Sequence, residues 1–321
     1  MKTDPIGIYI LSQIWYNNNR NNDTGCLKLI TAFIIISAVA ALAALVYIGL
    51  LYLTAPAEID EGLYRRLYDF TSVCFAHKGL YTSDQSVPEN TLSSFRAALE
   101  HGYGIDCDVQ RTWDGQAVCF CDSHMRTACG IDERMVSFNY EHLQRLKLFG
   151  TEETMPLLSD ALKLVDGQVP MIIEAKSPAG MRGVGETCEA IYSVLKDYKG
   201  PYCIASFDPH ILQWFRKNAP EVLRMQASMP YFDWRESDRN MLRCYYMSRF
   251  LCNVRSRPHL LVFSLGKRNW GLGLALKGRV PLLLYTATKR HMHEELLEKC
   301  DSLVFEGYEP PAQTRRAEKE Q

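Results

Sequence analysis

Short apolar runs alternate with amphipathic helical patterns from about residue 71 to residue 311. The runs are five or six residues long, as buried strands are, and in several of the stretches between them apolar residues recur every three or four positions. The predicted strands are Val73–His77, Ile105–Val109, Met171–Lys176, Tyr202–Ser206, Val222–Gln226, Leu260–Ser264, Pro281–Thr286 and Ser302–Glu306. The clearest helical patterns are Thr91–His101, Tyr140–Leu148, Leu158–Val165, Glu186–Tyr198 and Pro209–Asn218. Eight strands with intervening helices over about 240 residues indicate the α/β class and predict a TIM (β/α)8 barrel.

A ninth apolar run, Ala117–Cys121, follows Val109 too closely for a parallel crossover. Such a crossover needs about a dozen residues, whereas the Asp114-Gly115 pair is a hairpin turn signal. We therefore expect a β-hairpin that extends the second strand and brings Cys121 back to the barrel mouth. Mouth loops such as Met229–Asn253 are expected to determine which substrate is chosen.

One segment near the N-terminus differs from the rest of the chain. Leu29–Thr54 contains no charged residue and is rich in Ile, Leu, Val and Ala. As a helix it would reach ~39 Å, which exceeds the ~30 Å apolar core of a bilayer. A signal peptide has an apolar run of only about 7–15 residues, and a buried core helix normally has a polar face. The segment is therefore predicted to be a retained transmembrane helix.

Changes in composition along the chain predict the boundaries of its segments. We expect a polar, Asn-rich, unstructured tail (1–27), the transmembrane helix (28–55), an amphipathic linker helix (56–70), the barrel (71–311) and a charged tail (312–321). Three basic residues precede the span, and the next ones after it are Arg65 and Arg66. The positive-inside rule then predicts an N-terminus inside the cell and a barrel outside it.

Net charge and cysteine spacing bear on nucleic-acid binding, zinc binding and disulfide formation. A net charge of −1 gives no reason to expect a nucleic-acid partner. The eleven cysteines include no CxxC pair and no Cys/His spacing typical of zinc sites. Thiols without a disulfide framework favour a reducing compartment, in opposition to the flanking charges. The sequence leaves the side of the membrane and the oligomeric state open.

Three carboxylates lie at the predicted mouth of the barrel. Asp106 and Asp108 are two residues apart on one strand and therefore share a face. Glu174 lies near the end of the next barrel strand. Like charges so close need a cation, and three carboxylates suit Mg²⁺ or Ca²⁺. The alternative is that each acid caps a helix or pairs with Lys or Arg.

Neighbouring residues add proton-transfer and anion-binding groups. His77 ends the first strand and titrates near neutral pH. Lys78 and Lys176 are cations on the same rim, suited to phosphate oxygens. Taken alone, a histidine is more often structural and a lysine only solvated, so the inference depends on their shared position. Asn90 is expected to be the N-cap of the following helix, a structural role.

These residues form an ordered set of motifs: AHKG (76–79), PENT (88–91), IDCDV (105–109), TWDG (112–115), IIEAK (172–176), ASF (205–207), LYTAT (284–288) and FEGY (305–308). The set resembles the glycerophosphodiester phosphodiesterase family of TIM barrels over about residues 73–310. The resemblance implies a divalent cation and hydrolysis of glycerophosphodiesters to glycerol 3-phosphate and an alcohol. It also implies that Asp106, Asp108 and Glu174 hold the metal, that His77 moves protons, and that Lys78, Lys176 and Tyr285 contact the substrate.

The sequence departs from the family pattern at four of these positions. Lys78 replaces an arginine and loses its bidentate fork, Asp106 replaces a glutamate, and Tyr285 replaces a tryptophan. Cys121 stands at the position of the second catalytic histidine, and loss of one proton-transfer group typically lowers a rate by about 10²–10⁴. His124 would substitute for it only if its loop folds back.

Two functions follow from these observations. The first is a membrane-anchored, metal-dependent phosphodiesterase of lipid metabolism that acts on glycerophosphodiesters or lysolipids, with Cys121 in the second catalytic position. The alternative is a catalytically impaired barrel that binds glycerophosphodiesters or lipid head groups without turnover. A related phosphodiesterase chemistry on lysolipids or wall polymers is a third, lesser alternative.

Overall fold

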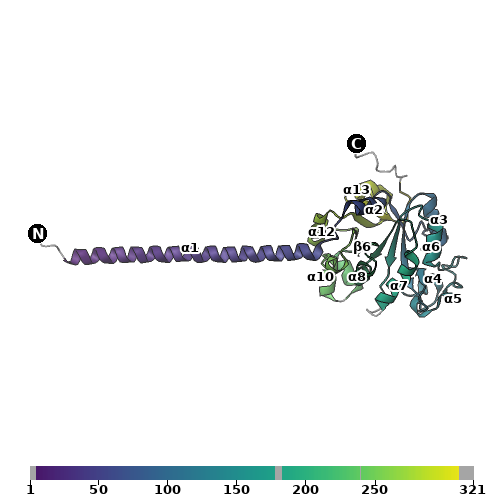
Figure 1. Ribbon diagram of the computed structural model, residues 1–321, viewed down its shortest axis with the longest axis horizontal. Helices are drawn as coiled ribbons and strands as arrows, with labels where there is room; N and C mark the ends of the chain where they lie inside the picture. Colours follow the sequence, from purple (N-terminus) through teal and green to yellow (C-terminus); the bar gives the residue numbers. More distant parts are fainter. Residues whose placement is uncertain (1–4, 178–182, 239, 311–321) are drawn as a thin grey trace. The chain divides into compact units, whose positions relative to one another are not determined.

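The computed structural model describes residues 5–177, 183–238 and 240–310 and divides the chain into two compact units, 1–52 and 53–321. The predicted charged tail, 312–321, lies outside the described residues. The first unit consists of the helix α1 (Pro5–Thr54), whose last residues belong to the second unit (Figure 1). Within α1, Leu27–Thr54 is long and apolar enough to cross a membrane, and its most apolar 18 residues have a mean hydropathy of 2.8 with none of them buried.

The expectation of an unstructured tail over 1–27 is wrong for residues 5–27, which are helical. A helix that is already nucleated gains one backbone hydrogen bond for each residue added. The apolar segment supplies that nucleus, so the polar residues before it continue the same helix.

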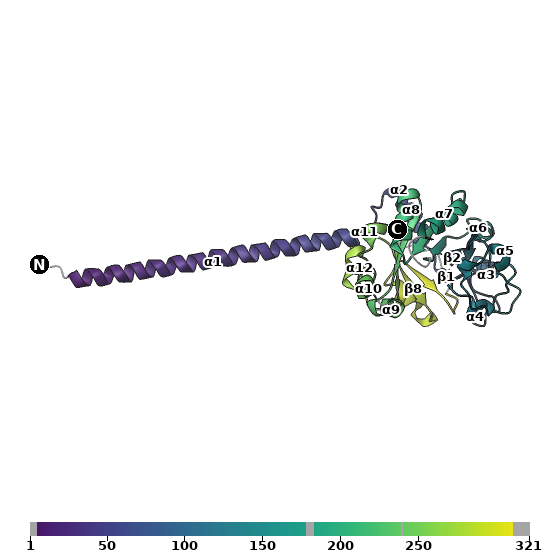
Figure 2. The same cartoon turned by 90° about the horizontal axis from the view of Figure 1, so that it is seen from below.

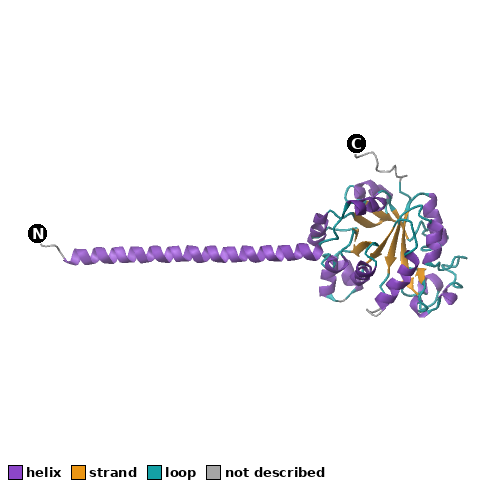
Figure 3. Cartoon of the chain, in the orientation of Figure 1, coloured by secondary structure: helices purple, strands orange, loops and turns teal. Residues whose placement is uncertain are grey.

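The second unit contains a closed parallel barrel, which confirms the predicted fold (Figure 3). Each of the eight predicted strands is present within two residues of its expected bounds. Neighbouring strands follow the order β1-β9-β8-β7-β6-β5-β4-β2, and β1 pairs with β2 to close the ring. The barrel strands are β1 (Phe75–His77), β2 (Gly104–Arg111), β4 (Met171–Ala175), β5 (Tyr202–Ser206), β6 (Leu223–Ser228), β7 (Leu260–Ser264), β8 (Leu282–Ala287) and β9 (Ser302–Phe305).

The predicted hairpin is also confirmed. β3 (Ala117–Cys119) pairs antiparallel with β2, and Val109 lies opposite Cys119. Helices separate the strands: α3 (Leu92–Glu100), α4 (Arg126–Cys129), α5 (Tyr140–Leu143), α6 (Leu158–Val165), α7 (Val184–Leu195), α8 (Pro209–Asn218), α9 (Tyr231–Ser237), α10 (Met241–Ser248), α11 (Asn253–Ser256), α12 (Trp270–Ala275) and α13 (His293–Leu297). The segment expected as one mouth loop, Met229–Asn253, instead contains α9 and α10.

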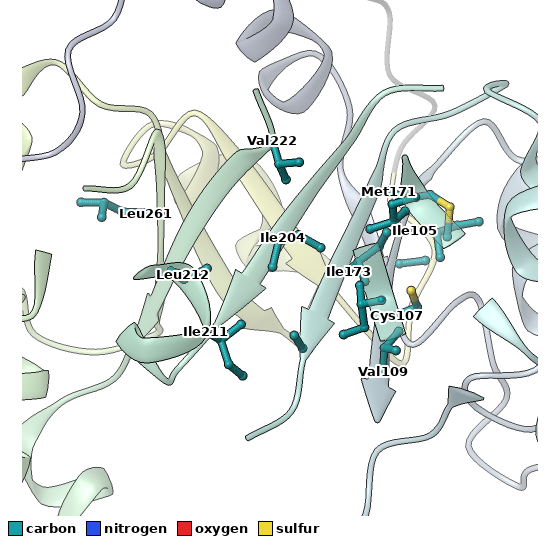
Figure 4. Close-up of a cluster of buried hydrophobic side chains, with 14 of the residues drawn as sticks. Ile105, Cys107, Val109, Met171, Ile173, Ile204, Ile211, Leu212, Val222 and Leu261 are labelled. Atoms are coloured by element: carbon teal, nitrogen blue, oxygen red, sulfur yellow. The ribbon is translucent and has the colours of Figure 1, made fainter. Parts of the chain in front are cut away.

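Alternation along β2 explains how the barrel positions polar groups inside an apolar shell. Ile105, Cys107 and Val109 pack outward in the cluster between the strands and helices (Figure 4). The residues between them, Asp106 and Asp108, therefore face the barrel interior. The apolar shell around them keeps these carboxylates at least 90% buried.

The linker helix closes one end of the barrel. α2 (Glu61–Thr71) begins at Asp60, whose side chain caps the Leu63 N–H at 2.7 Å. Its buried residues Leu67 and Phe70 join the interior cluster, and the Phe70 ring stacks on Phe75 at the start of β1. The end at which the strands begin is therefore filled by α2, and a cavity can form only at the opposite end.

A buried histidine joins β6 to the segment before β7. His259 accepts a hydrogen bond at Nδ1 from the Arg224 backbone N–H (3.1 Å), and its Nε2 lies 3.2 Å from the Arg224 guanidinium. With Nδ1 as the acceptor, Nε2 carries the proton of the neutral imidazole, and a second proton on Nδ1 would remove the acceptor that the Arg224 N–H uses. Burial, reinforced by the charge of Arg224, lowers the pKa of His259 to about 3.

This histidine predicts an acid-sensitive stability. Between pH 6.5 and about 3 the unfolded chain binds a proton at His259 that the folded chain does not bind, so the free energy of unfolding falls as the pH falls below 6.5, by about 1.4 kcal/mol per pH unit. Replacing His259 by Gln is expected to reduce the loss between pH 7.5 and 5.0 by about 2 kcal/mol. Thermal or urea unfolding of the full chain in detergent at both pH values measures it. The exposed His142 serves as the control, since His142→Gln should leave the loss unchanged.

Candidate active site

A cavity of about 250 Å³ opens at the ends of the strands opposite α2. Its polar lining consists of most of the predicted site residues. These are His77, Lys78, Asp106, Cys121, Glu174 and Lys176. Its apolar lining includes Phe207, Met225 and Val262, and the predicted Tyr285 lies with them. The fold therefore brings into one cavity the predicted site residues from His77 to Tyr285, which are far apart in the chain. The predicted metal ligand Asp108 does not line the cavity but pairs with Lys176.

The two aspartates differ in their surroundings. Asp108 lies beside Glu174 in the register of β2 and β4, and its Oδ2 accepts a hydrogen bond from Asn90 Nδ2 (3.2 Å). Asp106 lies deeper, and its buried Oδ1 has no hydrogen-bond partner among the described residues. Burial, together with the nearby charges of Glu174 and Asp108, raises the pKa of Asp106 to about 7. This carboxylate is therefore short of positive charge.

Lys176 provides part of the missing charge. Its Nζ lies 2.7 Å from Asp108 Oδ1 and 2.5 Å from Glu174 Oε1. Burial is the largest influence and alone would raise the pKa of Asp108, but the charges of Lys176, His77 and Lys78 together outweigh it and hold that pKa well below its usual range. One lysine thus bridges two of the three carboxylates, and Asp106 is left out.

His77 is held by a carboxylate that sequence reasoning missed. His77 Nδ1 lies 2.7 Å from Glu306 Oε2, which also accepts a hydrogen bond from the Tyr81 hydroxyl (3.1 Å). Burial disfavours the imidazolium, yet the bond to Glu306 and the charges of Asp106 and Asp108 leave the pKa of His77 raised. The signal was present in the sequence, because Glu306 directly follows the last strand.

The motifs AHKG (76–79) and PENT (88–91) contact each other next to this histidine. The Asn90 N–H donates to the Lys78 carbonyl (2.9 Å), and Lys78 Nζ pairs with Glu89 at 2.8 Å. A Cβ at Gly79 would lie 2.5 Å from Ser94, so only glycine permits this approach. Asn90 is not the N-cap that the sequence suggested. Thr91 caps α3, and Asn90 is free to hold the backbone N–H and carboxylate of Asp108.

Comparison with known proteins identifies the family. The family model for the glycerophosphoryl diester phosphodiesterase family matches residues 77–272, more than half of the chain. The chain belongs to this family. The resemblance inferred from the motifs is therefore confirmed, and it covers the strands that carry His77, Asp106, Asp108 and Glu174.

Sequence and structure relatives agree with this assignment. A glycerophosphodiester phosphodiesterase of Caldanaerobacter subterraneus subsp. tengcongensis is 27% identical over 160 residues, which is 47% of this chain and 64% of the relative. The chain thus matches just under two thirds of that relative's length. An Oleispira antarctica phosphodiesterase in complex with sn-glycerol-3-phosphate has a TM-score of 0.59 at 22% identity, over 74% of this chain and 94% of its own. A putative enzyme of Silicibacter pomeroyi has a TM-score of 0.60 at 20% identity, over 75% and 93%. At these identities the two structures support the fold.

Cys121 lies where the family resemblance expects a second histidine. The Gln110 amide holds this turn by donating to the carbonyls of Phe120, Cys121 and Asp122 at 2.9–3.0 Å. Burial, followed by the Asp108 carboxylate to which the thiol hydrogen-bonds, raises the pKa of Cys121. The thiol is therefore neutral at physiological pH. His124 is exposed, pairs through a β-bridge with Arg134 and does not line the cavity, so it does not replace the missing imidazole.

The carboxylates match a hard divalent cation in chemistry. Asp106, Asp108 and Glu174 offer oxygen donors only, and the unpaired Asp106 Oδ1 is an uncompensated buried acceptor. In the described part of the chain, no three His, Cys, Asp or Glu side chains close around one point. Since Lys176 lies between two of the donors, a cation here requires the ammonium to leave the Asp108–Glu174 pair.

The Lys176 bridge predicts a stability effect that is independent of activity. Lys176→Met would leave the 2%-exposed Asp108 side chain and Glu174 without their cation. Removing one partner of a buried pair costs about 3–5 kcal/mol, and since Lys176 is 26% exposed we expect roughly 2–3 kcal/mol. Unfolding in the presence of a chelator measures it. Lys163 pairs with Asp160 while 78% exposed, so Lys163→Met should cost at most about 1 kcal/mol. Equal losses in the two variants would contradict the bridge.

Proposed function

We propose that the protein is a membrane-anchored, metal-dependent phosphodiesterase that hydrolyses glycerophosphodiesters to glycerol 3-phosphate and an alcohol. One observation carries the proposal: a single cavity is lined by an oriented histidine, two carboxylates and two lysines, and a third carboxylate, Asp108, pairs with one of these lysines. Family membership supports the same reaction. The complex of the Oleispira antarctica relative with sn-glycerol-3-phosphate supports glycerol 3-phosphate as the product.

Asp106, Asp108 and Glu174 would hold a divalent cation, Mg²⁺ or Ca²⁺. When bound, the ion would polarise the phosphodiester and offset the charge that builds on it. Asn90 fixes the Asp108 carboxylate for this role through its two hydrogen bonds. Lys176, once released from the two carboxylates, is within reach of a phosphate oxygen on the same rim.

His77 would carry the proton. Glu306 engages its Nδ1, which fixes the tautomer and turns Nε2 towards the reacting oxygen. Lys78 lines the same cavity and would pair with a phosphate oxygen. Cys121 contributes a neutral thiol, which donates a proton less readily than an imidazolium does. The apolar wall with Tyr285 and Phe207 is suited to the uncharged part of the substrate.

Leu27–Thr54 would anchor the enzyme in a membrane. Its flanking charges favour an N-terminus inside the cell and a barrel outside it. A membrane position would place the cavity close to lipid-derived diesters, and this supports a role in glycerophospholipid metabolism.

The second candidate is a barrel that binds these diesters or lipid head groups without turnover. Two observations favour it: the thiol at position 121 and the lysine that bridges two of the proposed metal ligands. Either feature would slow proton transfer or cation entry and leave the cavity able to bind an anion.

Activity measurements separate the two candidates. The full chain in detergent, with Mg²⁺ or Ca²⁺ and mixed glycerophosphodiesters, is expected to release glycerol 3-phosphate. His77→Ala should lower the rate by about 10²–10⁴, and His142→Ala should not change it. Cys121→His should raise the rate, because it restores a second proton-transfer group. A silent wild type that becomes active only as Cys121→His would favour the binding protein.

Cation binding has a separate readout in thermal stability. At a free concentration about 100-fold above Kd, a ligand stabilises the folded state by about 2.7 kcal/mol, or roughly 5 °C for a domain of this size. We expect such a shift with Mg²⁺ or Ca²⁺, and its loss in Asp106→Asn. The surface variant Asp160→Asn should keep it. An unchanged unfolding temperature in the wild type would argue against a metal-dependent enzyme.

A further inference from the structure

An exposed apolar surface lies on one side of the barrel unit. In the described residues from 53 to 310, five of the eight exposed large hydrophobic side chains belong to α9, α10 and α12. They are Phe232, Met241, Leu242, Tyr245 and Trp270. Leu242 is the most exposed of them, at 83%.

These side chains form one continuous surface. α9 packs on α10, and the Tyr245 ring lies 6.4 Å from the Trp270 ring. The Asn269 amide, which precedes α12, donates to the Ser248 carbonyl at the end of α10 (2.8 Å). Figures 1 and 2 show α10 and α12 on the same side of the barrel, with α9 beside α10 in Figure 2.

The sequence of α9 carries both signs of charge, with Asp233, Arg235 and Glu236, and the nearby Asp238 pairs with Arg243 at 3.4 Å. The rest of the surface is basic. The segments 241–257 and 265–280 together contain eight Arg or Lys residues and no Asp or Glu, although the whole chain has a net charge of −1. Arg243, Arg255, Lys267, Arg268, Lys277 and Arg279 of this group are exposed. Basic side chains among exposed Trp, Tyr and Leu are the combination found where proteins lie on anionic membrane surfaces.

The chain ties this surface to the end of the apolar helix. Thr54 is buried in the barrel unit, and its carbonyl accepts a hydrogen bond from Asn253 at the start of α11 (2.8 Å). The Ala55 carbonyl accepts one from Arg257 (2.9 Å). Pro56 contacts Gly278, just beyond α12. The segments that follow α10 and α12 therefore contact the residues at which the apolar helix ends.

The last two residues of the apolar helix, Leu53 and Thr54, belong to the barrel unit. The exposed residues of α10 and α12 are therefore part of the same compact unit as the end of the proposed span. If this unit adjoins the bilayer, a surface that stayed in water would expose five large apolar side chains.

We propose that α9, α10 and α12 form a docking surface that lies in the interface of an anionic phospholipid bilayer, the membrane that the apolar helix crosses. This inference depends on the proposed membrane span. Docking also bears on the cavity, because Trp234 of α9 packs against Phe207 (5.7 Å between ring centroids) and Phe207 against Tyr285 (6.0 Å). The lipid interface would then support the apolar wall of the cavity.

Trp270 and Trp113 provide a matched test. Both are exposed, at 40% and 72%, but Trp113 follows β2, on the hairpin side of the barrel. The full chain is reconstituted in phosphatidylglycerol-containing vesicles with or without brominated lipid. The contribution of each tryptophan is the fluorescence of the wild type minus that of its Trp→Phe variant. Brominated lipid should quench the contribution of Trp270 at least about twofold more strongly than that of Trp113. Leu242→Glu, a change at an exposed position, should weaken the quenching of Trp270.

Equal quenching of the two tryptophans would overturn the docking surface, as would Trp270 quenching that Leu242→Glu leaves unchanged. An alkaline wash separates this failure from failure of the span. A chain that stays in the vesicles while Trp270 is unquenched has a span but no docking surface. A chain that the wash releases has no span, and this result overturns both.

Discussion

The site is organised by the repulsion among three carboxylates at the mouth of a low-dielectric barrel. Alternation on β2 forces Asp106 and Asp108 onto the interior face, and barrel register places Glu174 beside Asp108. Two buried like charges at hydrogen-bonding distance from the same point are tolerated only with a cation between them. Lys176 supplies that cation for Asp108 and Glu174. The raised pKa of Asp106 shows that the negative charge of this third carboxylate is not compensated by a neighbouring cation. The proposed divalent ion is the simplest group that would satisfy all three.

The surrounding residues are arranged to keep these charges in place. Asn90 binds Asp108 because Thr91 takes over the capping of α3. Glu306 closes the other end of the site and couples β9 to β1 through His77. Backbone pairing joins β1 to β9, and the His77–Glu306 contact that orients the imidazole lies at the end of this pair of strands. This explains why residues at opposite ends of the domain appear in one small cavity.

Much of the fold was predictable, because barrel strands are short apolar runs and the Asp114-Gly115 turn excludes a parallel crossover for β3. The carboxylates and His77 were predictable for a related reason: polar residues at strand ends must face the mouth. Glu306 and the role of Asn90 were not predicted, since each depends on a partner far along the chain. The helical state of residues 5–27 was missed because their polarity reveals nothing about the apolar helix that follows.

The position of Cys121, where the family resemblance implies a histidine, is fixed by contacts that do not involve its side chain. Gln110 holds the turn around position 121 with three hydrogen bonds to backbone carbonyls, and none of them involves the thiol. The backbone is therefore fixed regardless of which side chain occupies this position, and an imidazole there would line the cavity as Cys121 does. In the proposed reaction, proton transfer would then fall mainly on His77, whose raised pKa suits the donation of a proton better than its removal. A site with one general acid and no matched base would protonate a leaving alkoxide and activate a nucleophile poorly. The proposed cation would have to compensate on the nucleophile side, so the proposal gives metal occupancy a larger role than it would have with two histidines.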